Sequence, residues 1–394
     1  MSAIVSAPGI RFEGAVRNLS SEGLGIVNAP DGLVFFVNGA WPGDEGLFEV
    51  ETRGPRYGYA RLVELRRPSP ERREPPCPHQ GTEAGRCGGC PWMIAEYPAQ
   101  ARAKEHRVRH AFERMRLDPE TSGFRPIWAA PSELGYRNRA QFKSDGERLG
   151  FVSEGRHEIA DIEDCYVLTA PLRDRFRALR GRLPNPAWRP TIDARKWVFL
   201  ELDDAMADDD EPELNRRRPF RQGNTSQNER MRAWVAARLA AARPASLLEL
   251  YCGSGNFTEL AVSAGVPEIL GVEVAAPALR ALEARAWPGV RTLARDLSEA
   301  WHFTRLAGEV GRPDVLLLDP PRAGAKGIER LVSRSDSLRE ILYVSCDVAT
   351  WSRDVSMLAK EGWEPVEVQP LDLFPQTFHV EVLSRLERRA TPPT

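Results

Sequence analysis

The sequence predicts an α/β protein in which a small β-barrel and a central α/β domain precede a doubly wound, mostly parallel sheet. Three observations support this fold class. Short strand-like segments separated by Gly, Asn and Pro fill residues 10–65, which is typical of a small barrel. Strands alternate with helices from about residue 226 onward, as in doubly wound sheets. A glycine-rich turn joins the first of these later strands to a helix.

The length and charge of the chain limit what it can be. Its 394 residues are enough for two or three domains, and its net charge of −2 does not by itself indicate nucleic-acid binding. We find no run near the roughly 18 apolar residues of a membrane span, and MSAIVSAPGIRFEGAV lacks the pattern of a signal peptide. We therefore expect a cytoplasmic monomer that does not contact membranes.

The N-terminal elements divide into a barrel and a central domain. The segments IRFEGAVRNLSSEGLGIV, GLVFFVNGA, GDEGLFEVETR and YGYARLVEL predict a barrel over residues 1–66, and the Pro-rich, charged RRPSPERREPPCPH predicts a linker. Residues 67–215 form the central domain, with an amphipathic helix over 91–113 and strands in AQFKSDGERLGFVS and RKWVFLEL. The acidic stretch at 201–213 is interpreted as a mobile loop.

Residues 216–394 supply the elements of the doubly wound sheet. Helices are predicted in QNERMRAWVAARLAA, NFTELAVSAG and APALRALEARAW, and strands in LLELYC, EILGVEV, PDVLLLDPP and EILYVSCD. VEVQPLDLF and HVEVLSRLERR predict a closing pair of strands.

The segment LLELYCGSGNFTELAVSAG predicts a nucleoside-binding turn. Gly253 and Gly255 allow the backbone to turn tightly and approach a ligand, and Glu273, twenty residues after Gly253, ends the next strand. A carboxylate at that place accepts hydrogen bonds from ribose hydroxyls. Thr258 stands where a dinucleotide site has its third glycine, and no P-loop is present. The ligand is therefore expected to lack a pyrophosphate.

The arrangement E-x-Y-C-G-S-G-N-F followed by V-E resembles the class I S-adenosylmethionine-dependent methyltransferases. This resemblance implies that S-adenosylmethionine lies across the carboxyl ends of the first strands and that Asp296, in TLARDL, contacts its adenine. An ordinary loop aspartate that caps a helix is the alternative for Asp296.

Cys346 follows the apolar strand ILYVS, and Asp319 follows the strand VLLL. Both strand ends face the cofactor crevice of a doubly wound sheet. A thiolate that adds to carbon 6 of a pyrimidine makes carbon 5 nucleophilic toward a methyl donor, and a base must then remove the proton on carbon 5. Glu381, in a strand expected beside that of Cys346, is the candidate base. A small core cysteine and a surface glutamate are the alternative interpretations.

Four segments resemble the motifs of the RNA uracil-5 methyltransferase family, namely VLLLDPPRAG, YVSCDVATWSRDV, FPQTFHVEVLSRLER and FRQGNTSQNERM. The resemblance implies a Rossmann-like methyltransferase domain with Cys346 as nucleophile and Glu381 as proton acceptor. It also implies that S-adenosylmethionine is bound by Gln222, Tyr251, Gly253, Asn256, Glu273, Asp296 and Asp319. The family usually has asparagine where this chain has Asp347, whose charge should raise the pKa of the thiol. EGAVRNLSSEGLGIV is similar to the start of a TRAM domain, a barrel that binds RNA in this family.

Four other cysteines form a candidate metal site. Cys77, Cys87 and Cys90 read C-x9-C-x2-C, and Cys165 follows in DIEDCYVL. Such a set fits either tetrahedral zinc or an iron-sulfur cluster. CGGCPWM resembles the pattern of ribosomal-RNA members of the family, which implies a 4Fe-4S cluster with a structural or RNA-binding role. Cys252 is expected to pack inside its turn.

The expected partner is RNA. ELGYRNRAQFK interleaves Tyr136 and Phe142 with basic residues, a mixture typical of surfaces that neutralise phosphates and stack on a base. The leading hypothesis is therefore methylation of carbon 5 of a uridine in structured RNA, most of all 23S rRNA. The alternatives are a tRNA uridine-5 methyltransferase and an RNA-binding module with a vestigial site. A cytosine methyltransferase fits the motifs less well.

Overall fold

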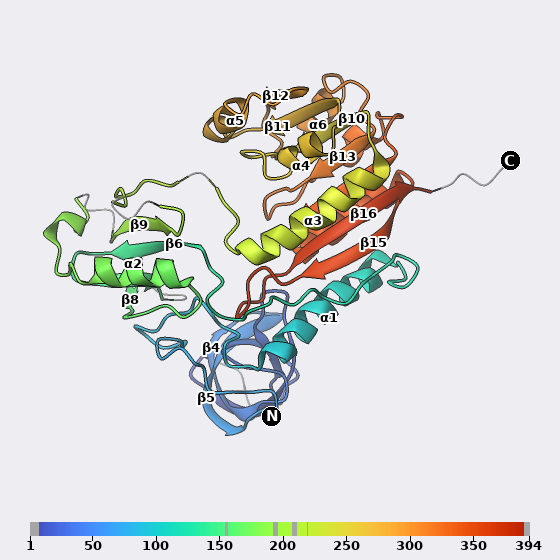
Figure 1. Ribbon diagram of the computed structural model, residues 1–394. Coiled ribbons are helices and arrows are strands. Elements are labelled where there is room, and N and C mark those ends of the chain that lie inside the picture. Colours follow the sequence, from blue (N-terminus) through green and yellow to red (C-terminus); the bar gives the residue numbers. More distant parts are fainter. Residues whose placement is uncertain (1–7, 154–156, 192–195, 207–210, 219, 390–394) are drawn as a thin grey trace. The chain divides into compact units, whose positions relative to one another are not determined.

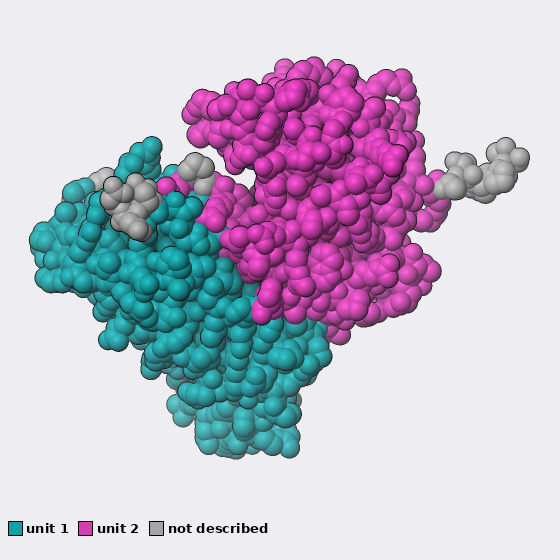
Figure 2. All heavy atoms as spheres, viewed as in Figure 1, with its two compact units in different colours: residues 1–103, 132–217, 374–378 teal, residues 104–131, 218–373, 379–394 magenta. Residues whose placement is uncertain are grey.

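The computed structural model describes residues 8–153, 157–191, 196–206, 211–218 and 220–389. The chain divides into two compact units, coloured separately in Figure 2. Unit 1 comprises Met1–Ala103, Ser132–Arg217 and Phe374–Phe378, and unit 2 comprises Lys104–Pro131, Arg218–Leu373 and His379–Thr394. The expected boundaries after residues 66 and 215 stay a prediction, since this division into units follows contacts rather than continuous segments.

A closed barrel forms the N-terminal part of unit 1, which confirms the barrel predicted there (Figure 1). Its strands follow the order β1-β2-β3-β5-β4. They are β1 (Arg11–Leu19), β2 (Gly25–Asn28), β3 (Val34–Asn38), β4 (Glu45–Arg53) and β5 (Tyr57–Arg67). Side chains on alternate positions point inward, and the rings of Phe12, Phe35 and Phe48 pack at the centre of the barrel core.

The rest of unit 1 contains an antiparallel sheet of order β8-β7-β6-β9. Its elements are β6 (Arg139–Ser144), β7 (Leu149–Val152), β8 (Ile159–Asp161), α2 (Ala170–Arg180), the 3₁₀ turn η1 (Pro186–Trp188) and β9 (Val198–Asp203). Part of the predicted acidic loop is therefore wrong, because residues 201–203 belong to β9 and pair with β6. Residues 207–210 of that stretch lie outside the described residues.

Helix α1 (Tyr97–Met115) begins six residues later than the helix predicted over 91–113. The preceding residues form turns because their hydrogen bonds go elsewhere. The carbonyl of Ile94 accepts from the backbone N–H of Arg73 at 2.8 Å, and the indole of Trp92 donates to the carbonyl of Gly23 at 2.9 Å. No helix in the described part of the chain is long and apolar enough to span a membrane.

Unit 2 is built on a seven-stranded sheet of order β12-β11-β10-β13-β14-β16-β15, which confirms the doubly wound fold (Figure 1). Strands β10 to β14 run parallel, whereas β16 is antiparallel to both of its neighbours. The strands are β10 (Ser246–Leu250), β11 (Glu268–Glu273), β12 (Val290–Ala294), β13 (Val315–Leu318), β14 (Glu340–Ser345), β15 (Trp363–Leu371) and β16 (Glu381–Arg388). The helices are α3 (Thr225–Ala242), α4 (Thr258–Ser263), α5 (Ala276–Glu283), α6 (Ala300–Leu306), α7 (Glu329–Val332) and α8 (Val348–Lys360).

The central strands of this sheet are covered on both faces, so they read as continuous apolar runs rather than alternating ones. All residues of β13 are buried, and Ile341, Tyr343 and Trp351 belong to the same core cluster. Because β10, β11, β13 and β14 are parallel, their carboxyl ends meet at one edge of the sheet. The polar residues that follow these strands are consequently gathered along that edge.

Candidate active site

The turn after β10 has the backbone geometry of a ligand-binding turn. Tyr251, Gly253 and Gly255 have positive φ values of 61°, 55° and 96°. The positive φ of Gly255 strains any residue with a side chain, and a Cβ there would also lie 2.8 Å from the Leu282 side chain, so glycine is favoured. Tyr251 is a non-glycine residue in this strained region, a feature that concentrates at functional sites. Cys252 is buried within the turn, as predicted.

Glu273 ends β11 with its carboxylate against this turn. One oxygen accepts from the backbone N–H of Gly253 at 3.2 Å, and the other accepts from the N–H groups of Val274 and Ala275, both at 2.8 Å. Each carboxylate oxygen can accept more than one hydrogen bond, so these contacts orient the group and leave acceptor capacity for ribose hydroxyls. The turn and the acidic residue therefore fit a nucleoside.

The other expected cofactor residues come from the turn itself, from the loop after β12 and from the segment before α3. Asn256 exchanges side-chain hydrogen bonds with Asn228 of α3 at 3.2 and 3.3 Å. Asp296 is exposed after β12, and its carboxylate accepts from the backbone N–H of Ser298 at 2.8 Å. Gln222 lies in the segment that leads into α3.

Cys346 and Glu381 come from adjacent antiparallel strands. The last residue of β14, Ser345, pairs with Val382 of β16, so Cys346 and Glu381 occupy the next position of the same register. Glu381 is 6% exposed and Cys346 is partly buried. The alternative of a surface strand glutamate is thus excluded for Glu381.

The electrostatics of this position couple a thiol to two carboxyls. Burial, then the charges of Glu381 and Asp319, raises the pKa of Cys346 to about 12, with Asp347 adding to the rise and Arg322 opposing it. Burial, followed by Asp319, raises the pKa of Glu381 to about 8, again against Arg322. Burial raises the pKa of Asp319 to about 7. At the carboxyl end of the sheet, the pKa of Cys346 therefore depends on the charges of Glu381 and Asp319, and the pKa of Glu381 depends on the charge of Asp319.

Asp347 has a structural role besides its charge. It is the N-cap of α8, where its carboxylate accepts from the backbone N–H of Thr350 at 2.8 Å. Asparagine caps a helix about as well as aspartate. The residue that the family usually has would therefore preserve the cap and remove the charge.

Sequence reasoning missed His379 at this site. Its Nε2 lies 3.1 Å from the guanidinium of Arg322 and accepts from it, because an arginine stays protonated. Burial, with the charges of Arg322 and Lys104 next, lowers the pKa of His379 to about 4, so the ring is neutral at pH 7. The available signal was its spacing of two residues from Glu381, which places both on one face of an extended chain.

The four remaining cysteines converge in unit 1. Cys77, Cys87, Cys90 and Cys165 line one pocket, together with Met93 and other residues. Burial is the main cause that raises the pKa of each thiol. The charges of neighbouring cysteines add to the rise for Cys87, Cys90 and Cys165, and the charge of Asp164 adds to it for Cys77. Among the described residues, no group of three or more His, Cys, Asp and Glu side chains has the geometry to hold a metal ion. The donor set nevertheless fits a sulfur-ligated group, because four thiols face one volume.

The aromatic residues expected to stack on a base do not form such a surface, so that prediction is wrong. Phe142 is fully buried in the core and stacks on Phe176, with ring centroids 4.5 Å apart. Tyr136 is 7% exposed and donates its hydroxyl to the carbonyl of Pro375 at 2.9 Å. Alternation along β6 turns Phe142 toward the sheet's covered face, and Arg139 pairs with Glu201.

The barrel exposes a different aromatic surface that sequence reasoning missed. Tyr57 and Tyr59 are 47% and 40% exposed, and both rings pack edge-on or tilted against Phe36. They line a pocket at the end of β4 and start of β5 together with Thr52, Arg53, Gly54, Pro55, Arg56 and Gly58. The signal in the sequence was YGY, in which two tyrosines at i and i+2 share one face of a strand.

The strand order, the strained turn and the acidic residue after β11 define a class I S-adenosylmethionine-dependent methyltransferase. A family model described as tRNA (Uracil-5-)-methyltransferase matches residues 213–389. The chain is 40% identical over 384 residues to an uncharacterized RNA methyltransferase of Nitrosomonas europaea, covering 96% of this chain and 97% of the relative. It is 30% identical to the 23S rRNA (uracil(1939)-C(5))-methyltransferase RlmD of Pseudomonas aeruginosa, covering 94% and 93% of the two chains. The chain therefore belongs to the RNA uracil-5 methyltransferase family.

A solved structure shares the whole fold. The tRNA (uracil-54, C5)-methyltransferase of Pyrococcus abyssi, in complex with S-adenosyl-L-homocysteine, superimposes with a TM-score of 0.70 at 21% sequence identity. The match covers 95% of this chain and 99% of that one. At this identity the likeness concerns the fold, and it includes the parts outside the methyltransferase sheet.

Proposed function

We propose that this enzyme methylates carbon 5 of a uridine in 23S rRNA through a covalent adduct between Cys346 and carbon 6 of the base. The observation that carries the proposal is the shared register position of Cys346 and Glu381 at the carboxyl end of the sheet. A thiol and a carboxyl with a raised pKa are thereby held side by side, at the same edge of the sheet as the turn that fits a nucleoside.

Each of these residues has a defined task in the proposed reaction. S-adenosylmethionine supplies a methyl group activated by its sulfonium charge. The thiol of Cys346 loses its proton to solvent and the thiolate adds to carbon 6. The electron pair displaced toward carbon 5 forms the bond to the methyl group as the bond between methyl and sulfonium sulfur breaks and S-adenosylhomocysteine leaves. The Glu381 carboxylate then accepts the proton of carbon 5, so that the double bond re-forms and the thiolate leaves. Its pKa of about 8 suits a base that operates near neutral pH.

Arg322 and His379 would support the developing charge. The Arg322 guanidinium opposes the rise in the pKa of Cys346 and of Glu381, so it favours the thiolate and the carboxylate over their neutral forms. The neutral ring of His379 accepts a hydrogen bond from it without adding a second positive charge.

The proposed substrate is ribosomal RNA rather than transfer RNA. Relatives named as 23S rRNA methyltransferases align along more than nine-tenths of this chain, and the expected cysteine pattern resembles the ribosomal-RNA members. Transfer RNA is the second candidate, because the matching family model and the superimposed archaeal enzyme carry tRNA in their names. A cytoplasmic location is part of the proposal with either RNA.

A trapping experiment tests the chemistry. RNA that carries 5-fluorouridine has no removable proton on carbon 5, so the wild-type protein should form a covalent complex that survives denaturing electrophoresis. Cys346→Ala should form none, and Glu381→Gln should accumulate a complex even with unmodified RNA. An RNA-binding module with a vestigial site would give no covalent complex in any of these lanes.

Nucleoside mass spectrometry with mapping of modified positions identifies the substrate. Cells that lack the gene should lose 5-methyluridine from 23S rRNA. Loss from tRNA alone would establish the second candidate, and unchanged levels in both RNAs would reject the proposed reaction.

We also propose that Cys77, Cys87, Cys90 and Cys165 hold a 4Fe-4S cluster. The four partly buried thiols line one pocket and their pKa values are raised, mainly by burial, so they are costly to ionise without a metal, and a cluster core would stabilise the thiolates. Methyl transfer requires no electron, so the cluster would act on folding or RNA contact. Iron and sulfide analysis of anaerobically purified protein should give four of each per chain. Stoichiometric zinc would instead identify a tetrahedral zinc site.

The exposed surface of Tyr57 and Tyr59 is the proposed RNA contact of the barrel. Two accessible rings beside Arg53 and Arg56 offer stacking for unpaired bases and positive charge for phosphates. This surface replaces the one expected from ELGYRNRAQFK.

A further inference from the structure

The segment Phe374–Phe378 belongs to unit 1 although the strands on either side of it belong to unit 2. Strand β15 ends at Leu371 and β16 begins at Glu381, so only His379 and Val380 separate the segment from the proposed base. We refer to Phe374–Phe378 as the strap. Its internal turn is closed by Thr377, whose hydroxyl donates to the carbonyl of Phe374 at 2.7 Å.

Apolar contacts anchor both ends of the strap. Phe374 packs against the cluster of Met93, Tyr136 and Val167, to which the side chains of Cys77, Cys90 and Cys165 also belong. Phe378 packs against the cluster that contains Trp41 and Trp92. A Cβ on Gly23 would lie 2.5 Å from the Cβ of Phe378, so this approach is too close for any residue but glycine. The strap thus runs between two packed clusters of unit 1.

Gln376, at the middle of the strap, is fully buried and has a positive φ of 69°. A buried non-glycine residue in the left-handed region persists only where its surroundings hold it there. Its backbone N–H donates to the side-chain oxygen of Gln100 at 2.9 Å, and its carbonyl accepts from the N–H of Trp92 at 3.0 Å. Backbone contacts on both sides therefore fix this conformation.

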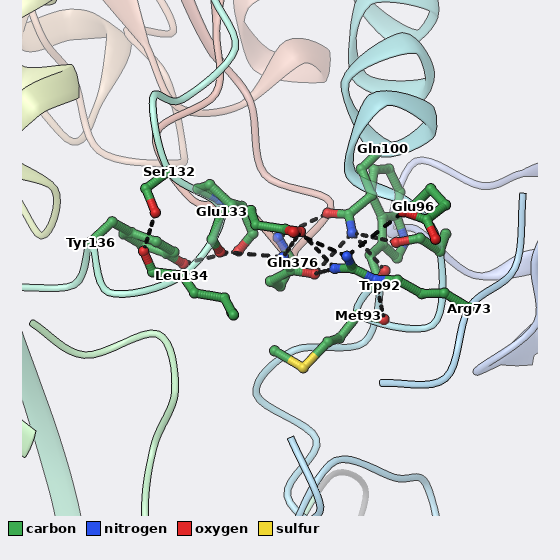
Figure 3. Close-up of polar contacts among 12 residues, drawn as sticks. Arg73, Trp92, Met93, Glu96, Gln100, Ser132, Glu133, Leu134, Tyr136 and Gln376 are labelled. Atoms are coloured by element: carbon green, nitrogen blue, oxygen red, sulfur yellow. Dashed lines mark hydrogen bonds and ion pairs between the residues drawn. The ribbon is translucent and has the colours of Figure 1, made fainter. Parts of the chain in front are cut away.

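The side chain of Gln376 completes a polar network, shown in Figure 3. Its oxygen accepts from the amide of Gln100 at 2.8 Å and from the guanidinium of Arg73 at 3.3 Å. Its amide donates to the Glu133 carboxylate at 2.9 Å and to the Glu133 carbonyl at 3.2 Å. Arg73 and Glu133 are in turn joined by an ion pair at 2.6 Å. Only this orientation of the Gln376 side-chain amide places its oxygen toward the donors of Gln100 and Arg73 and its nitrogen toward the acceptors of Glu133.

We propose that Gln376 is a positioning residue for Glu381, and that the strap fixes the path by which the chain enters β16. Glu381 pairs with Leu371 of β15, but it lies one position beyond the last pair of β14 with β16. On the side of Cys346 its place therefore depends also on the path of the residues that precede it. The inference rests on the proposed function, in which Glu381 accepts the proton of carbon 5. A purely structural role for Gln376 predicts a different kinetic defect.

The distinguishing signature is the covalent complex. If Glu381 is displaced, Cys346 can still add to the base, but the proton of carbon 5 is removed slowly and the adduct persists. A protein that is merely destabilised loses addition and release together, so that its covalent fraction falls with its activity. Misplacement of a reacting group by about 1 Å costs up to about 100-fold in rate.

The test uses the full-length protein with unmodified 23S rRNA fragments. Gln376→Leu should lower kcat by about 10- to 100-fold, leave KM for RNA within about twofold, and raise the steady-state covalent fraction above wild type. Gln376→Asn tolerates positive φ and should fold even where the leucine variant does not, while its amide is too short for the same contacts. A covalent fraction that does not rise in the folded variants would overturn the inference.

A reciprocal exchange provides the matched control. Gln376→Glu alone places two carboxylates together, and Glu133→Gln alone removes the nearer of the two carboxylates that pair with Arg73. The double variant Glu133→Gln/Gln376→Glu restores one carboxylate, one amide and the contact with Arg73, but not the donation to the carbonyl of residue 133. We therefore expect it to recover part of kcat and to lower the covalent fraction relative to both single variants. Recovery no better than in the singles would argue against the network.

Failure of this inference is distinguishable from failure of the proposed function. If Cys346→Ala retains activity or Glu381→Gln traps no RNA, the proposed chemistry is wrong whatever Gln376 does. If both behave as expected and the folded Gln376 variants turn over like wild type, only the positioning role is rejected.

Discussion

The carboxylate of Asp347 stabilises the N-terminus of α8, but its negative charge disfavours the Cys346 thiolate. It raises the pKa of Cys346, although less than burial and the neighbouring acids do, and it caps α8. Asp347→Asn should keep the cap and lower the pKa of the thiol, giving more thiolate at pH 7 and faster adduct formation, by less than about tenfold. The rate of covalent complex formation with 5-fluorouridine RNA between pH 6.5 and 9 measures this.

Asp347→Ala is the control for the cap. It also removes the charge, but it should lower the free energy of unfolding by about 1 kcal/mol because the N–H of Thr350 loses its acceptor. Slower adduct formation by Asp347→Asn than by wild type would contradict the assigned electrostatic role.

The buried carboxyl of Glu381 is expected to lower the free energy of unfolding at alkaline pH. Its pKa of about 8 in the folded protein exceeds the usual 4.5, so the folded state holds a proton that the unfolded state releases. Stability from this group is complete below pH 4.5 and is lost as pH rises to about 8. Glu381→Gln should remove this loss and raise the free energy of unfolding at pH 8, on the order of 3 kcal/mol, while abolishing turnover.

Denaturant unfolding at pH 5 and pH 8 checks this expectation. Glu387→Gln is the matched control, because Glu387 is an exposed glutamate of the same strand. An equal fall in stability between the two pH values in wild type and Glu381→Gln would refute the burial argument.

Residues that follow apolar strands were the most predictable part of the site. Cys346, Asp319 and Glu273 could be placed because parallel strands end at one edge, and that follows from the chain pattern alone. Phe142 could not be placed, because alternation identifies two faces of β6 without saying which is covered. His379 was hidden because its role depends on a contact with Arg322, 57 residues away in the chain.

Among the elements, the β4–β5 end of the barrel should carry measurable RNA affinity. Tyr57→Ala/Tyr59→Ala removes two exposed rings, and base stacking on an aromatic side chain contributes about 1–3 kcal/mol per base. We expect Kd for the RNA substrate to rise about 5- to 100-fold, with kcat at saturating RNA unchanged. Tyr57→Phe/Tyr59→Phe keeps both rings and should bind like wild type. Unchanged affinity in the alanine variant would exclude this surface from RNA contact.

Helix α1 is joined to the end of β15 by a fully buried ion pair. The ammonium of Lys104 lies 2.6 Å from the carboxylate of Asp372, and both side chains are inaccessible to solvent. Lys104→Met leaves a buried carboxylate without this partner and should cost about 3–5 kcal/mol in unfolding free energy. Lys104→Met/Asp372→Leu should recover much of the loss, since an apolar pair avoids the desolvation cost. Equal stability of the single and double variants would contradict this account.

At the scale of elements, the sequence predicted the strands and helices better than their ends. The barrel and the doubly wound sheet follow from periodicity, which is a local property. The start of α1 does not, because residues 91–96 satisfy their hydrogen bonds with groups distant in the chain such as the carbonyl of Gly23. The strap could not be predicted either, because its contacts are also distant in the chain. Gln376 contacts Gln100 across 276 residues and Arg73 across 303.

For the whole molecule, the division into units matters more than the order of predicted domains. Three segments of the chain contribute to each unit, and α1 contributes its first residues to unit 1 and its remainder to unit 2. Dividing the sequence into continuous domains identifies which folds are present. It cannot show that each unit is built from separate segments, because that division depends on contacts in the folded chain rather than on composition.

The position of the strap near the end of the chain also sets an order for biosynthesis. Domains generally fold as they leave the ribosome, beginning at the N-terminus. Unit 1 lacks Phe374–Phe378 until the strands of the parallel sheet have been synthesised. Until then Gln100, Arg73 and Glu133 cannot form their hydrogen bonds with Gln376. Unit 1 therefore has all of its residues only after most of unit 2 has been made, and a ribosome that stops before Phe374 releases a chain in which unit 1 is incomplete.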